Sequence, residues 1–150
     1  MREIKFRGKS KNTNEWCYGT YIFTDDNRNN PFRTRPFKES HRIVFWCSGD
    51  WNMGGWVDEE VIPETIGQYT GLKDKNGKEI YEGDIVDAWS AGGHLPNGII
   101  KWSEGIAGFF IMPPKYNAVW HLVGNDENKE TLEVLGNIHD NPELIKEEEK

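Results

Sequence analysis

The sequence contains only two cysteines, Cys17 and Cys47, and no apolar run approaches the roughly 18 residues that a membrane-spanning helix needs. Two cysteines cannot form a disulfide framework, and each stands in an apolar, strand-like stretch, so we expect two buried free thiols. The N-terminus also lacks the apolar stretch of a signal peptide. These absences predict a protein that remains in the cytoplasm of the cell that makes it.

The sequence patterns of enzymes are missing as well. The four histidines are not spaced as zinc ligands on one helix, and together with the cysteines they repeat no known ligand spacing. Gly71 and Gly77-Lys78 suggest a phosphate-binding loop, but five residues separate the glycines where that motif has four, and Glu79 replaces its Ser or Thr. We therefore predict a non-enzymatic protein with no catalytic residue, no metal and no cofactor.

What is present indicates a folded, mainly β protein. Aromatic residues make up 13% of the chain and include seven tryptophans, which is more aromatic surface than disordered chains carry. Sixteen glycines and seven prolines are spread along the chain rather than clustered. This spacing is typical of many short strands joined by turns.

The first half of the chain is predicted to form strands and hairpins. Apolar and aromatic runs between turn residues predict four strands, over residues 3–8, 15–23, 41–47 and 56–62. Further on, Asn76-Gly77 is a strong signal for a two-residue type I′ turn, in which both residues have positive φ.

The second half shows a regular pattern of five short apolar segments separated by turn residues, over residues 84–89, 98–103, 107–112, 118–123 and 132–138. Five strands at this spacing favour a small barrel, of either the SH3-like or the OB type. Asn141-Pro142 is a typical start of a short helix. We expect three parts: a β-rich segment over 1–83, a barrel over 84–140 and a C-terminal tail over 141–150, with the N-terminal hairpins packed on the barrel.

Two neighbouring stretches, Ile66–Asp74 and Gly77–Val86, resemble the hallmark of the YopX family of phage and prophage proteins. Lys5–Gly8 is similar to that family's opening hairpin, and Leu132–Leu144 is similar to its closing motif. Only residues 24–55 show no pattern to match. The resemblance implies a β-rich fold that contains an SH3-like barrel and a source in a phage or prophage. It implies no established activity, so no residue inherits a catalytic role.

Charge is segregated along the chain. Up to Arg42, ten Lys and Arg stand against five Asp and Glu, a net charge of +5, whereas the remainder has eight against twenty, a net charge of −12. A basic segment on an acidic body can bind anions, dock on a neighbour's acidic surface, or simply be solvated. The candidate anion-binding or nucleic-acid-binding residues are cations interleaved with phenylalanines: Arg33, Arg35, Lys38 and Arg42.

Three apolar side chains in a glycine-rich stretch are candidate partner-binding residues: Trp51, Met53 and Trp56. The alternative is that they cover the protein's own core. We predict a binding or assembly module whose partner is a second copy of the chain, as a homo-oligomer, or a phage or host protein, and no membrane. The alternatives are a nucleic-acid-binding protein that uses its basic N-terminal region and an acidic decoy inhibitor of a host DNA-binding protein.

Overall fold

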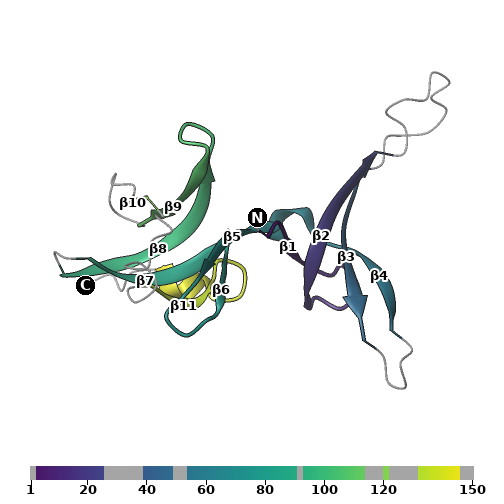
Figure 1. Ribbon diagram of the computed structural model, residues 1–150, viewed down its shortest axis with the longest axis horizontal. Helices are drawn as coiled ribbons and strands as arrows, with labels where there is room; N and C mark the ends of the chain where they lie inside the picture. Colours follow the sequence, from purple (N-terminus) through teal and green to yellow (C-terminus); the bar gives the residue numbers. More distant parts are fainter. Residues whose placement is uncertain are drawn as a thin grey trace. The chain divides into compact units, whose positions relative to one another are not determined.

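The computed structural model describes residues 3–25, 39–48, 54–90, 93–113, 120–121 and 132–145. Contacts divide the chain into two compact units, one of residues 4–67 and one of residues 68–150 with residues 1–3. Figure 1 shows that both are built of β-strands, which confirms the predicted mainly β class. Helical structure within the described ranges is limited to two 3-10 turns, η2 (Pro63–Thr65) and η3 (Pro142–Ile145), and neither is long enough to cross a membrane.

The first unit contains four antiparallel strands: β1 (Phe6–Lys9), β2 (Trp16–Asp25), β3 (Glu39–Cys47) and β4 (Gly55–Glu60). The four strands predicted for this part of the chain are therefore confirmed. Each strand pairs with the next, so that β1 lies beside β2, β2 beside β3 and β3 beside β4. Such a meander needs no crossover connection.

Successive side chains of a strand point to opposite faces of the sheet, and the two faces of β2–β3–β4 differ in burial. One face carries Ile43, which is fully buried, with Phe45 and Val57. Val61 follows β4, is also fully buried, and bridges to Ser10 after β1. We call the opposite side the tryptophan face; it consists of Thr20, Ile22, Arg42, Val44, Trp46, Trp56, Asp58 and Glu60.

The second unit contains the remaining strands: β5 (Gly67–Lys73), β6 (Glu79–Tyr81), β7 (Asp84–Ser90), β8 (Gly93–Ser103), β9 (Gly108–Met112), β10 (Trp120–His121) and β11 (Leu132–Asn137). Strands β7 to β11 form one antiparallel sheet in the order β10-β9-β8-β7-β11, so β11, the last strand of the sequence, pairs with β7. This sheet curls into a half-barrel around Val86, Ile100 and Ile111.

The five strands predicted after residue 83 are thus present, although β10 is only two residues long. The hairpin β5–β6 also belongs to this unit, whereas the sequence grouped it with the N-terminal segment. Its turn is tied to β11, because the Lys75 N–H donates to the Leu132 carbonyl at 2.9 Å. At the C-terminus the 3-10 turn η3 stands where a helical tail was expected, and residues after 145 lie outside the described ranges.

The predicted type I′ turn at Asn76-Gly77 is wrong. Gly77 has a φ of 81°, but Asn76 is not among the described residues with positive φ. The loop is one residue longer: the Gly77 N–H donates to the Asp74 carbonyl, and the Asp74 N–H donates to the Lys78 carbonyl. These bonds define a type I turn followed by a left-handed glycine. Aspartate is common at the first position of such a turn, because its carboxylate can accept backbone N–H groups of the turn. Here the Asp74 carboxylate accepts the N–H groups of Asn76 and Lys78.

We expect Gly77→Val to lower the free energy of unfolding by about 1 to 2 kcal/mol, because β-branched residues resist positive φ. A Cβ at Gly77 meets nothing within 4 Å, so the loss reports backbone strain alone. Chemical denaturation measures it. Gly55→Ala is the control, since Gly55 is also open and has no positive φ; equal, small effects at both positions would argue against the strain.

The expectation of two buried thiols also needs correction. Cys47 is exposed and Cys17 only half-buried, although both are free thiols. Burial, followed by the carboxylates of Glu59 and Glu15, raises the pKa of the Cys17 thiol, which therefore stays protonated at neutral pH. Near β1, Ile4 is exposed and Arg7 is buried, the reverse of a simple amphipathic strand.

Candidate interaction surface

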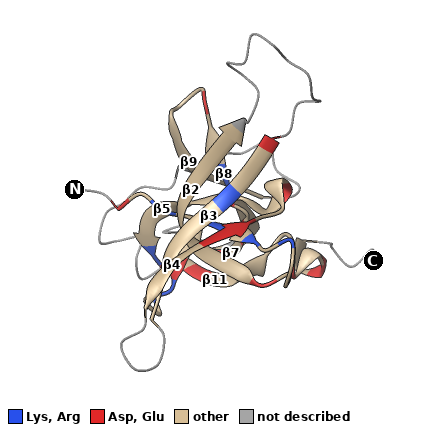
Figure 2. Ribbon diagram, turned by 90° about the vertical axis from the view of Figure 1, so that its right-hand side faces the viewer, with Lys and Arg blue, Asp and Glu red and all other residues tan. Residues whose placement is uncertain are grey.

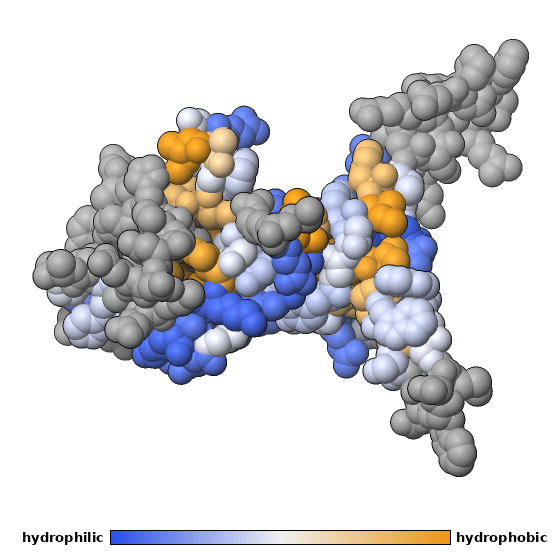
Figure 3. Space-filling view, viewed as in Figure 1, coloured by the Kyte–Doolittle hydropathy of each residue, from blue (hydrophilic) through white to orange (hydrophobic). Residues whose placement is uncertain are grey.

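The tryptophan face carries two large aromatic side chains that are more than half exposed. Trp46 on β3 and Trp56 on β4 are directly opposite each other in the ladder, and their rings meet edge to face with centroids 5.5 Å apart. Trp46 is 56% exposed and Trp56 is 72% exposed. Ile22 on β2 is also exposed, and Val44 on β3 is partly so. Figure 3 shows apolar side chains open to solvent on this unit.

The Trp46 ring is held in place despite its exposure. A Cβ at Gly54 would lie 2.7 Å from the indole, so the backbone of Gly54 passes close against the ring. The Trp56 ring packs against the same indole from β4. A ring that is already fixed loses little conformational entropy when a partner covers it, which is the property of an effective binding residue.

The charged side chains of the tryptophan face are paired within the chain. The Arg42 Nε donates to an Asp58 carboxylate oxygen at 2.5 Å, and an outer guanidinium nitrogen donates to the Asp58 carbonyl at 3.1 Å. The Asp58 carboxylate is the main reason that the pKa of Arg42 is raised. Glu60 pairs with the Lys11 ammonium at 2.6 Å. Figure 2 shows the single cationic position of β3 beside acidic positions of β4.

The structure brings together one member of each predicted site. Trp56, from the candidate partner-binding residues, and Arg42, from the candidate anion-binding residues, lie on the same sheet face. The other candidates, Trp51, Met53, Arg33, Arg35 and Lys38, lie outside the described residues. Trp46 was not among the predicted candidates, because it stands in the uniformly apolar run Ile43–Trp46 of a predicted strand. No signal in that run distinguishes its two faces; only the burial of Ile43 in the structure shows that Val44 and Trp46 point to the opposite side.

Two further cations of the basic first third pack on an aromatic ring. The Arg7 guanidinium lies 4.6 Å from the centroid of the Trp16 ring, and the Lys9 ammonium lies 5.5 Å from it. Such cation–π contacts keep the apolar stems of both side chains against the indole. A base that stacked on the exposed part of Trp16 would have to displace these contacts.

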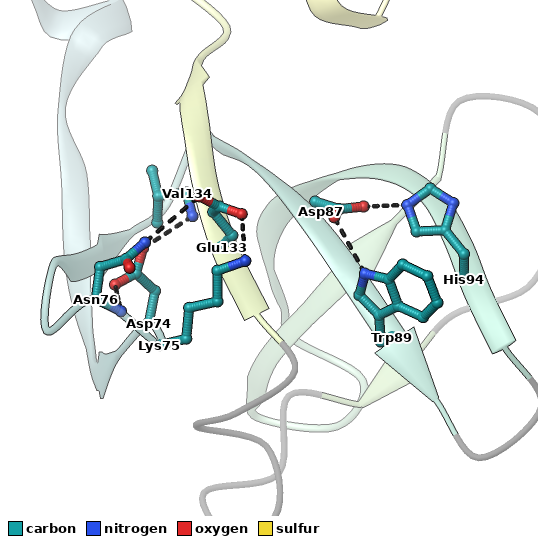
Figure 4. Close-up of polar contacts among 8 residues, drawn as sticks. All are labelled: Asp74, Lys75, Asn76, Asp87, Trp89, His94, Glu133 and Val134. Carbon is teal, nitrogen blue, oxygen red and sulfur yellow. Dashed lines mark hydrogen bonds and ion pairs between the residues drawn. The ribbon is translucent and has the colours of Figure 1, made fainter.

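A second cluster of polar side chains lies on the outer side of the five-stranded sheet (Figure 4). His94 on β8 is hydrogen-bonded to Asp87 on β7, and the Trp89 Nε1–H donates to the same carboxylate at 3.3 Å. The His94 and Trp89 rings are tilted against each other with centroids 4.8 Å apart. This arrangement orients the His94 imidazole.

Lys75 and Glu133 form an adjoining ion pair of 2.5 Å between the β5–β6 hairpin and β11 (Figure 4). The Glu133 carboxylate is the main reason that the pKa of Lys75 is raised. Among the described residues no group of three or more His, Cys, Asp and Glu is arranged to hold a metal ion. The charged groups of this surface therefore connect strands with one another.

Fold and surface together define a small, mainly β protein of curled antiparallel sheets with an exposed aromatic sheet face. The chain matches the model of the family described as YopX protein over residues 5–146, and it belongs to that family. No curated protein matches the sequence. The fold is similar to the crystal structure of protein EF1440 from Enterococcus faecalis, with a TM-score of 0.56 and 25% sequence identity. The similarity covers 97% of this chain and 100% of that chain.

Proposed function

We propose that this YopX-family protein is a non-enzymatic binding module that contacts a protein partner through the tryptophan face. The observation that carries the proposal is the pair Trp46–Trp56, two large exposed side chains fixed against each other in one ladder. Tryptophan dominates the binding energy of many protein interfaces. The second unit would serve as a scaffold, a small SH3-like barrel in which the half-barrel of β7–β11 closes, followed by a short helical tail.

The internal ion pairs favour an apolar partner over a polyanion. Asp58 already neutralises Arg42, and Glu60 already neutralises Lys11, so neither cation is available to a phosphate without loss of an existing contact. Nucleic-acid binding through Arg33, Arg35 and Lys38 stays a prediction, as does the acidic decoy. The family resemblance favours a phage or prophage protein that acts in the bacterial cytoplasm, with a second copy of the chain or a phage or host protein as the partner.

The proposal is tested by capture of proteins from a bacterial lysate on the immobilised chain. We expect Trp46→Ser with Trp56→Ser to reduce the captured material by more than about tenfold, because each buried interface tryptophan contributes about 2 kcal/mol or more. Quantitative mass spectrometry of the bound fraction measures the loss.

The matched control is Trp89→Ser with Trp102→Ser, which removes two tryptophans that are 54% and 41% exposed in the second unit. Both double variants are first checked for native circular dichroism. If the Trp46–Trp56 double variant captures as much protein as the wild type and the Trp89–Trp102 double variant captures none, the contact surface lies on the second unit and the proposal is refuted.

A further inference from the structure

The order of charges across the tryptophan face is self-complementary. At one end of the β3–β4 ladder Arg42 stands opposite Glu60. Two residues further along, Val44 stands opposite Asp58. At the other end Trp46 stands opposite Trp56. On this face β3 thus carries one cation, Arg42, and β4 carries two carboxylates, Asp58 and Glu60, with aromatic rings at one end. A second copy presents the same pattern.

Two copies of such a face can stack about a two-fold axis that runs parallel to the strands and lies between the sheets. This rotation exchanges left and right but keeps the level along the strands. It therefore sets β3 of one copy over β4 of the other, at the spacing of about 10 Å found between packed sheets. Arg42 then faces Glu60 of the second copy, and Trp46 faces Trp56 of the second copy.

The other in-plane axis, perpendicular to the strands and centred on the ladder, gives a poorer match. It sets β4 over β4 with its direction reversed, so that Asp58 faces Asp58 of the second copy. Two carboxylates brought together in a desolvated contact repel each other. The charge pattern therefore selects the first axis.

We infer that the occupant of the tryptophan face is a second copy of this chain, related by the two-fold axis parallel to β3 and β4. This inference rests on the proposed function and gives its partner. The contact sets the Arg42–Asp58 ion pair of each copy against the Glu60–Lys11 ion pair of the other, so Arg42 and Glu60 face each other twice while each keeps its own partner. It also contains two Trp46–Trp56 stacks, as a closed symmetric interface requires.

The test is sedimentation velocity with charge-reversed variants. The wild-type protein is expected to shift from 17.4 kDa towards twice that mass as its concentration rises through the micromolar range. Arg42→Glu alone and Glu60→Arg alone are each expected to remain monomeric, because both reciprocal pairs become repulsive. An equimolar mixture of the two variants is expected to restore the dimer, because every cross-copy pair is then of opposite sign.

Each variant is first checked for native circular dichroism. If Arg42→Glu fails to fold for want of its pair with Asp58, Trp56→Ser replaces it as the disruptive variant, since that side chain is 72% exposed. The same loss of dimer is expected from Trp56→Ser, while Trp102→Ser in the second unit leaves the dimer intact.

A wild-type protein that stays at 17.4 kDa throughout overturns the second copy as occupant. The proposed axis is overturned if Arg42→Glu or Glu60→Arg alone dimerises as strongly as the wild type. It is also overturned if the equimolar mixture of these two variants does not associate. Each of these results leaves the lysate capture to be judged separately. If capture still depends on Trp46 and Trp56 in a strictly monomeric protein, the binding module survives and its partner is a different protein.

Discussion

Replacing Asp74 with asparagine is expected to lower the free energy of unfolding at neutral pH by about 3 kcal/mol. The Asp74 side chain is buried, and its carboxylate accepts backbone N–H groups from Asn76 at 2.8 Å, Lys78 at 2.9 Å and Val134 at 3.0 Å. It therefore joins the β5–β6 turn to β11. Asparagine keeps the shape but removes the charge and turns an N–H donor towards one of these donors. Urea denaturation measures the loss.

The pH dependence of this effect provides an internal check. Burial acts to raise the pKa of Asp74, but the N–H groups of Val134, Lys78 and Asn76 outweigh it and hold the pKa below its usual value. The stabilisation is complete above the unfolded-state pKa of about 3.9 and is lost as the pH falls through the lower folded-state pKa. Wild type and Asp74→Asn should therefore converge in strong acid. The control is Glu104→Gln, which removes an exposed carboxylate. If the difference in unfolding free energy between wild type and Asp74→Asn persisted unchanged in acid, the Asp74 charge would not be its cause.

Replacing Gly19 with alanine is expected to destabilise the first unit by about 2 to 3 kcal/mol. A Cβ at Gly19 would overlap the Val44 carbonyl oxygen and lie 2.9 Å from the Val44 carbonyl carbon. These are backbone atoms of β3, so no side-chain rotation relieves the clash, and the pairing of β2 with β3 must shift. Thermal unfolding followed by tryptophan fluorescence measures the effect.

Gly55→Ala is the matched control for Gly19→Ala. Both glycines belong to strands of the same unit, but a Cβ at Gly55 meets nothing within 4 Å. We expect a change of no more than about 0.5 kcal/mol at Gly55. Similar losses at both positions would show that glycine content, and not the approach of Val44, is what the first unit depends on.

The sequence predicted the strands well because their boundaries are marked by turn residues, and those signals are local. The type of the 74–78 turn was mispredicted for an equally local reason. Asn76-Gly77 and Asp74 favour two different loops, and the aspartate prevails because its carboxylate also binds the Val134 N–H on a distant strand. That last contact links residues 60 positions apart and has no signature in either segment.

The candidate surface was only partly predictable. Trp56 follows two glycines and was recognisable as a residue without an obvious place in the core. Trp46 was not, because Ile43-Val44-Phe45-Trp46 is apolar throughout and such a run shows no alternation from which to read its faces. Only the burial of Ile43 shows that the alternate residues Val44 and Trp46 point outwards. The pairing of Arg42 with Asp58 was likewise hidden, since it depends on the register of β3 against β4.

The return of β11 to β7 has a consequence for the order in which the protein folds. In the first unit every strand pairs with the next along the chain, so its contacts can form as soon as residues 4–67 are available. In the second unit β7 (Asp84–Ser90) finds its outer neighbour only in β11 (Leu132–Asn137), after the rest of the meander has been made. Closing this long loop costs entropy before any contact is gained, which slows folding. During synthesis the tryptophan face can therefore be complete while the core around Val86 and Val134 still lacks its last strand.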